Sequence, residues 1–306
     1  MQRDKREYIH IVENYMGNTR FKYYLDTNAV RSLASRLDEC NRIGAFISVW
    51  TICEMLGHII KKPEDFGKIR KNFCSIRDSE ISIVTKTPNE LHYSAFSLEL
   101  LLPIDFTFRN LMVMALQTLE VETFEEWMNK IEEHSLWGTY QLVKTIDEAI
   151  PLLNQNIEKQ YSTDISMRES KQKYEEFVQN EDKELTHQRL LNYYVDGFIE
   201  KHSEVRQMGK SLGLSYEEFR QFLCSLYDGS IDLAFRVNAC FVDKKVSLRQ
   251  KCGRNDDKDM MHLYYVQNGI ILVTDDTALR DNVVAQYPER AISVGQFKDL
   301  LNNMNK

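Results

Sequence analysis

Closely spaced cysteine pairs are missing from the sequence. No Cys-x-x-Cys motif occurs among the six cysteines, so the spacing that marks a zinc knuckle is absent. Isolated cysteines of this kind are typical of a reducing compartment, where the thiols stay reduced and mostly buried. The six are Cys40, Cys53, Cys74, Cys224, Cys240 and Cys252.

Long apolar runs are missing as well. No stretch approaches the roughly 20 apolar residues that a membrane-spanning helix needs. The N-terminal segment is charged and holds no apolar stretch of the kind found in secretory signals. We therefore expect a cytoplasmic protein without membrane contact.

An excess of basic residues is missing too. The chain has 39 Lys and Arg against 46 Asp and Glu, which gives a net charge of -7. A general nucleic-acid coat protein would be basic, so the balance argues against that class. It does not exclude a metal-dependent nuclease, because such a site needs acidic ligands and a bound cation changes the local sign of the charge.

What the sequence does contain is an alternation of short apolar runs and helical periodicity at both ends. With 306 residues, of which 43% are hydrophobic, it is long enough for one large globular domain or two medium ones. Short strands that alternate with helices imply a parallel sheet, so we expect an α/β fold. The expected strands cover residues 21–25, 45–49, 81–84, 270–273 and 291–294. The expected helices beside them cover residues 28–42, 54–60, 259–268, 277–285 and 296–303.

Helical periodicity dominates the middle of the chain, from about residue 90 to residue 242. We therefore expect an α/β core in two parts, residues 1–90 and 245–306, separated by an all-helical insertion at residues 91–244. Capping-box patterns predict helix starts inside the insertion. They begin at Thr123, Ser166 and Ser215.

Acidic residues lie at the ends of two predicted strands. Asp26 and Asp276 both fall at carboxyl ends, where parallel sheets form their sites, so we expect them to belong together. Glu54 lies one to two turns into a predicted helix, and Asp259 lies at the start of another. These four positions supply carboxylates from four different elements.

Four converging carboxylates suit the hydrolysis of phosphodiesters. That reaction requires charge stabilisation at the phosphate and an activated water, and one or two Mg²⁺ or Mn²⁺ ions supply both. These ions take oxygen ligands, chiefly carboxylates, together with water and substrate phosphate. A site of this kind needs no His or Cys ligand, in contrast to zinc hydrolases.

The order of the acidic motifs resembles that of the PIN-domain nuclease family. Its members carry an LDTN-like strand end, a Ser or Thr followed by a helical Glu, a DxxDxxHLA-like helix start and a final LVTxD strand end. The matching stretches are Leu25-Asp26-Thr27-Asn28, Ser48 to Glu54, Asp256 to Leu263, and Leu272 to Asp276. They lie within residues 1–90 and 245–306, so the resemblance implies a PIN-like core over these two segments.

Residue by residue, the resemblance implies a catalytic quartet that binds Mg²⁺ or Mn²⁺. Asn28 and Thr274 are expected to orient carboxylates or phosphate. Asp256 and Asp275 are extra acids, which either support the residues that hold the metal or are alternatives within the quartet. His262 has no chemical role in this resemblance, and we expect it to pack or to make a structural hydrogen bond. The quartet is Asp26, Glu54, Asp259 and Asp276.

The chain departs from the family in two ways. It is far longer than a minimal PIN domain, and Tyr264 and Tyr265 replace the usual small residues. These tyrosines either face the sheet, where the core must make room, or face a cleft and stack on bases. A basic stretch before Asp256 either holds substrate phosphates or is a solvated helix face. Its residues are Lys244, Lys245, Arg249, Lys251 and Arg254.

The resemblance implies an endoribonuclease that cuts single-stranded or loop RNA, tRNA included, in a toxin or phage-defence system. The insertion would position RNA or bind a protein partner that inhibits or activates the enzyme, and assembly into a homo-oligomer stays open. One alternative is a structure-selective DNA nuclease, which cleavage of flapped DNA would distinguish. The other is a non-catalytic scaffold with a degenerate PIN core, against which a convergent acidic pocket would argue.

Overall fold

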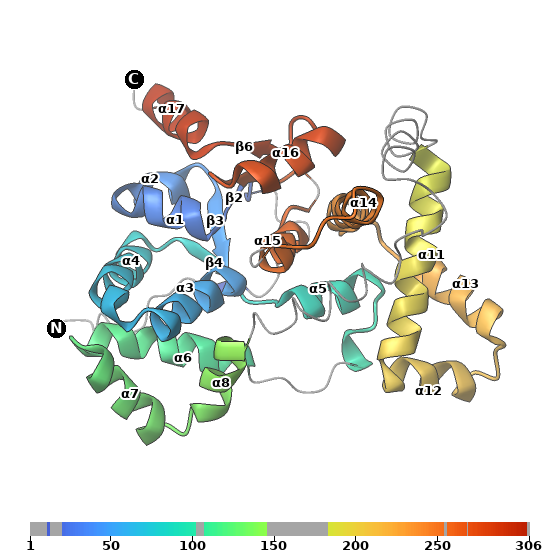
Figure 1. Cartoon of the computed structure of the whole chain (residues 1–306), viewed down its shortest axis with the longest axis horizontal. Coiled ribbons are helices and arrows are strands. Elements are labelled where there is room, and N and C mark those ends of the chain that lie inside the picture. Colours follow the sequence, from blue (N-terminus) through green and yellow to red (C-terminus); the bar gives the residue numbers. More distant parts are fainter. Residues whose placement is uncertain are drawn as a thin grey trace. The chain divides into compact units, whose positions relative to one another are not determined.

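The computed structural model describes residues 11–12, 20–101, 107–145, 183–253, 256–267 and 269–304 (Figure 1). The chain divides into two compact units, which we call the sheet unit and the helical unit. The sheet unit comprises Met1–Pro88, Asp105–Asp147 and Met261–Lys306. The helical unit comprises Asn89–Ile104 and Glu148–Met260.

The sheet unit is built on one sheet of six strands. Their spatial order is β1 (Ile11–Val12), β4 (Ser82–Val84), β3 (Ala45–Ser48), β2 (Tyr23–Leu25), β5 (Ile271–Val273) and β6 (Ala291–Ile292). Every pairing is parallel, so the expected α/β class with a parallel sheet flanked by helices is confirmed. β3 and β4 are buried along their whole length, which explains their continuous apolar runs. β1 was not expected.

The strand order reverses at the middle of this sheet. From β2 the chain proceeds to β3 and β4 on one side, and later to β5 and β6 on the other. Ligands of open parallel sheets bind beyond the carboxyl ends of the strands at such a switch point. The carboxyl ends of β2 and β5 are therefore the place in this fold where a site is expected.

The helices after the first strands lie close to their expected positions. The single helix expected at residues 28–42 is divided by a 3-10 turn, and the helix that carries Glu54 begins at Val49 because Ser48 caps it. That helix ends just before Pro63. The elements are α1 (Thr27–Leu33), η2 (Ala34–Arg36), α2 (Leu37–Arg42), α3 (Val49–Lys61), η3 (Pro63–Asp65) and α4 (Phe66–Ser79).

The C-terminal segment of the sheet unit also follows the expected alternation. α16 (Thr277–Gln286) and α17 (Val294–Met304) follow β5 and β6. The helix expected at 259–268 begins earlier in the chain and also ends earlier, and it consists of α15 (Asp256–His262) and the turn η6 (Leu263–Tyr265). Tyr265 is fully buried and its ring stacks on that of Tyr24, with ring centroids 5.2 Å apart. It faces the sheet, so it does not offer a surface for stacking on bases.

Three helices from the expected insertion belong to the sheet unit. α6 (Thr107–Glu120), α7 (Phe124–Glu133) and α8 (Trp137–Thr145) share one hydrophobic core with α3 and α4. Trp127 is fully buried there and its indole N–H donates to the carbonyl oxygen of Met114 at 3.0 Å. The capping box at Thr123 is present. The expected insertion at residues 91–244 therefore does not form a single unit, because these apolar faces pack with α3 and α4.

The regular elements among the described residues of the helical unit are all helices or 3-10 turns. They are α5 (Pro88–Ala95), η4 (Glu99–Leu101), α11 (Lys183–Lys201), α12 (Ser203–Ser211), α13 (Tyr216–Leu226), α14 (Asp232–Ser247) and the start of α15. The predicted capping box at Ser215 is present, and the one at Ser166 lies outside the described residues. The unit extends to Met260, beyond the expected boundary at residue 244.

Two further expectations concern membranes and thiols. Among the helices of the described segments, none has the length and apolarity to span a bilayer. All six cysteines are free thiols, and Cys40, Cys53 and Cys252 are buried.

Candidate active site

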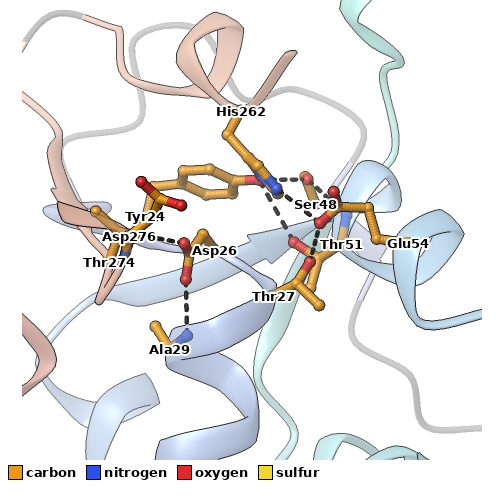
Figure 2. Close-up of polar contacts among 10 residues, drawn as sticks. All are labelled: Tyr24, Asp26, Thr27, Ala29, Ser48, Thr51, Glu54, His262, Thr274 and Asp276. Atoms are coloured by element: carbon orange, nitrogen blue, oxygen red, sulfur yellow. Dashed lines mark hydrogen bonds and ion pairs between the residues drawn. The ribbon is translucent and has the colours of Figure 1, made fainter. Parts of the chain in front are cut away.

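Asp26 lies at the switch point of the sheet, directly after β2. Its backbone N–H donates to the carbonyl oxygen of Val273 at 3.3 Å, which ties it to the end of β5. The side chain is 3% exposed and caps α1, because its Oδ1 accepts from the N–H of Ala29 at 2.7 Å. Its Oδ2 accepts from the hydroxyl of Thr274 at 2.5 Å. Both carboxylate oxygens are thus held by donors from two elements (Figure 2).

The environment of Asp26 opposes its ionisation. Burial raises the pKa of Asp26 above its ordinary value, and the nearby Glu54 carboxylate raises it further. His262 and the hydrogen bonds from Thr274 and Ala29 act in the opposite direction on the same pKa, but burial is the largest cause. A cation beside this carboxylate would offset the cost of its buried charge.

Thr274 connects Asp26 to the start of α16. Its side chain is fully buried, and its Oγ1 accepts from the backbone N–H of Asp276 at 2.9 Å while donating to Asp26. Asp276 is partly exposed and caps α16, where its Oδ1 accepts from the N–H of Leu279 at 2.8 Å. Thr274 was expected to orient a carboxylate, and its contact with Asp26 is of that kind.

Glu54 reaches the site from α3. Its side chain is 14% exposed, and its Oε2 accepts from Nε2 of His262 at 2.9 Å. The hydroxyl of Thr27, the first residue of α1, donates to the same oxygen. Glu54 is therefore fixed from α1 and from α15, and it is near enough to Asp26 to raise the pKa of that residue.

His262 and Tyr24 are buried residues that contact each other at the site. Nδ1 of His262, which is 2% exposed, lies 2.6 Å from the hydroxyl of Tyr24. Tyr24 is fully buried, and its hydroxyl lies 2.8 Å from Oγ of Ser48 and 3.4 Å from Oγ1 of Thr51. Burial raises the pKa of Tyr24 well above its ordinary value, so the phenol stays neutral. The hydrogen bond expected for His262 is thus made to an acid of the predicted site.

A cation lies in electrostatic reach of both carboxylates. Arg31 is partly buried on α1, one turn beyond Thr27. Burial lowers the pKa of Arg31, while Glu54, Asp65 and Asp26 raise it. Its positive charge reduces the repulsion between Glu54 and Asp26.

Sequence reasoning missed Arg31, Thr27 and Tyr24 as members of the site. Tyr24 had a signal, because it precedes Asp26 by two residues in a strand and so shares its face. Thr27 stood inside the LDTN-like motif without a role.

The four acids of the expected quartet are divided between the two units. Asp26, Glu54 and Asp276 belong to the sheet unit, whereas Asp259 lies in the helical-unit part of α15, one turn before His262. Over the described ranges, no group of three or more His, Cys, Asp or Glu side chains is arranged to hold a metal ion.

The predicted supporting acids have structural contacts. Asp275 accepts from the N–H of Val294 at 3.0 Å, at the start of α17. Asp256 accepts from the N–H of Gly253 at 2.7 Å and pairs with Lys245 at 3.0 Å. Asn28 is exposed on α1.

The described side chains of the basic stretch are partly buried or exposed. The ammonium of Lys245 is 3.2 Å from the carbonyl oxygen of Lys251 in addition to its pair with Asp256, and its side chain is 17% exposed. That ammonium is therefore engaged within the helical unit. Lys244, Arg249 and Lys251 are exposed, and Arg254 lies outside the described residues.

Comparisons with known proteins do not indicate the chemistry of this site. No family model, no curated protein and no solved structure matches the chain. The parallel sheet and the pair Asp26 and Glu54 at its switch point define an α/β protein with a candidate acidic site.

Proposed function

We propose that the protein is a metal-dependent endoribonuclease that hydrolyses phosphodiester bonds of single-stranded or loop RNA. One observation carries the proposal: buried hydrogen bonds hold Asp26 at the switch point between β2 and β5, and a second set holds Glu54 close enough to raise the pKa of Asp26. The preference for RNA, tRNA among the substrates, and a role in a toxin or phage-defence system rest on the resemblance to PIN-domain nucleases.

The donor set of the site fits Mg²⁺ or Mn²⁺. These ions prefer oxygen ligands, and Mg²⁺ is commonly held by one or two carboxylates while water and substrate phosphate complete its shell. Asp26 and Glu54 would hold the ion here, and Asp276 is linked to Asp26 through Thr274. When bound, the ion would stabilise charge on the phosphate and activate water. Asp259 as a fourth ligand stays a prediction.

The remaining residues prepare the two acids for this task. Thr274 and the N–H of Ala29 orient Asp26, and Thr27 and His262 orient Glu54. Because these donors come from fixed elements, the carboxylates need little reorganisation before they act. The positive charge of Arg31 lowers the energetic cost of keeping two carboxylates together when no metal ion is bound.

A scaffold is the second candidate, and one observation favours it. No third acid joins Asp26 and Glu54 to form a metal-holding group among the residues that the structure describes. A degenerate core would retain the fold and the hydrogen bonds without cleaving nucleic acid.

Cleavage assays with Asp26→Asn distinguish these candidates. Wild type and variant would be incubated with total RNA, single-stranded DNA and flapped DNA, each with Mn²⁺ or with EDTA. We expect discrete RNA fragments from wild type with Mn²⁺ only. Cleavage of flapped DNA alone would identify a structure-selective DNA nuclease, and no cleavage of any substrate would favour the scaffold.

A matched control separates the effect of losing a site residue from the effect of removing one negative charge from the surface. Asp38 is an exposed acid of α2, and it pairs with Arg42 at 3.2 Å. Asp38→Asn removes the same charge from the same unit and should cleave as wild type does.

A further inference from the structure

His262 is a buried imidazole with both ring nitrogens in contact with side chains of the candidate site. Nδ1 lies 2.6 Å from the hydroxyl of Tyr24, and Nε2 lies 2.9 Å from Oε2 of Glu54. We propose that His262 is a positioning residue for Glu54 and that Tyr24 fixes the tautomer in which it acts. The importance of Glu54 rests on the proposed function, whereas the hydrogen-bond geometry does not.

The direction of each hydrogen bond follows from the chemistry of the partners. An ionised carboxylate only accepts, so Nε2 of His262 carries the hydrogen that it donates to Glu54. In a neutral imidazole the other nitrogen is then an acceptor, so the hydroxyl of Tyr24 donates to Nδ1. The assignment therefore predicts the Nε2–H tautomer.

The contacts behind Tyr24 agree with this direction. Oγ of Ser48 accepts from the N–H of Thr51 at 3.3 Å, which leaves its own hydrogen for the oxygen of Tyr24 at 2.8 Å. The chain of donors then runs from Ser48 through Tyr24 and His262 to Glu54 without conflict.

This arrangement restricts a side chain that would otherwise rotate freely. Glu54 has three rotatable bonds, and two donors on different elements, Thr27 and His262, meet at its Oε2. His262 is 2% exposed, so water does not readily take its place. Partners that orient a metal-binding carboxylate affect metal affinity by roughly 10- to 100-fold when removed.

Nitrogen NMR of the metal-free protein tests the tautomer directly. The chain has seven histidines, and the signals lost in His262→Gln identify those of His262. We expect a protonated Nε2 and an unprotonated Nδ1 in wild type, and a shift of the Nδ1 signal in Tyr24→Phe. A protonated Nδ1 with a bare Nε2, or an unchanged His262 spectrum in Tyr24→Phe, would overturn the proposal.

Binding of Mn²⁺ tests the effect on Glu54. His262→Leu removes the donor, and we expect its Mn²⁺ affinity, measured from free Mn²⁺ by electron paramagnetic resonance, to fall by roughly 10- to 100-fold. His262→Gln keeps an N–H donor and should recover most of the affinity. His58→Leu is the control, because His58 pairs with Asp65 at 2.7 Å on the same helix as Glu54 and should leave affinity unchanged.

The two measurements separate this proposal from the proposed function. If His262→Leu and wild type bind Mn²⁺ equally, His262 does not position Glu54. If wild type binds no Mn²⁺ but its spectrum shows the Nε2–H tautomer that depends on Tyr24, the metal-dependent function fails and the Tyr24–His262–Glu54 arrangement stands. If circular dichroism shows that His262→Leu is unfolded, the nitrogen NMR spectrum of Tyr24→Phe tests the proposal instead.

Discussion

The ionisation of Asp26 has an energetic consequence at the scale of a single residue. Burial raises the pKa of Asp26 above its ordinary value of 3.8, so the folded protein binds this proton more tightly than the unfolded chain. The resulting stabilisation is complete below the ordinary value and is lost as the pH rises through the raised one. Ionised Asp26 therefore lowers the free energy of unfolding at neutral pH.

We expect Asp26→Asn to be more stable than wild type at pH 7, with a difference that shrinks as the pH falls toward 3.8. Asn caps helices about as well as Asp, so the start of α1 is preserved. Urea unfolding at several pH values measures the difference. A variant no more stable than wild type at pH 7 would show that burial does not dominate the energetics of Asp26.

Local sequence patterns predicted only some residues of this site. Asp26 and Glu54 were predicted because strand ends and helical positions can be recognised within a few residues. The hydrogen bond between His262 and Glu54 joins residues 208 positions apart, and periodicity carries no information on such a pair. The cation Arg31 was missed because its approach to the acids depends on how α1 packs.

At the scale of elements, Thr274 is the side chain that joins β2 to β5 at the site. Its hydroxyl donates to Asp26 and accepts from the N–H of Asp276. The spacing of strands and helices was predictable around it, because β2, β3, β4, β5 and β6 each carry a short apolar run. The two residues of β1 were not, since a pair of apolar residues is too short to show a period.

Thr274→Val should lower the free energy of unfolding by about 1–3 kcal/mol, because it leaves buried polar partners unsatisfied without changing side-chain size much. Loss of the bond to the charged form should also raise the pKa of Asp26 further. Thr274→Ser keeps the hydroxyl and is the control. Equal unfolding midpoints for the Val and Ser variants would show that this hydroxyl does not connect the strands energetically.

At the scale of the whole molecule, helical periodicity did not reveal which unit each helix joins. The region from α6 to α8 has the same kind of amphipathic pattern as the helical unit, yet its apolar faces are buried with those of α3 and α4. Packing partners are set by shape and by contacts between distant segments, so periodicity did not show that Asp105–Asp147, inside the expected insertion, joins the sheet unit.

Trp127 tests this assignment of α6 to α8. Trp127→Ala should lower the free energy of unfolding of the sheet unit by roughly 3–5 kcal/mol, because the indole is fully buried against Phe66 and its neighbours. Trp137 on α8 is 51% exposed, and Trp137→Ala should change stability by no more than about 0.5 kcal/mol. Similar effects of the two substitutions on unfolding would contradict the common core.

The central claim is that Asp26 and Glu54 support metal-dependent cleavage of RNA. The measurement that tests it most directly is the initial rate of RNA cleavage with Mn²⁺, for wild type, Asp26→Asn and Asp38→Asn. A cation that supplies several kcal/mol to the transition state predicts a loss of about 100-fold or more in Asp26→Asn, with Asp38→Asn unchanged and EDTA abolishing cleavage. Equal rates for Asp26→Asn and wild type, or cleavage that persists in EDTA, would contradict the claim.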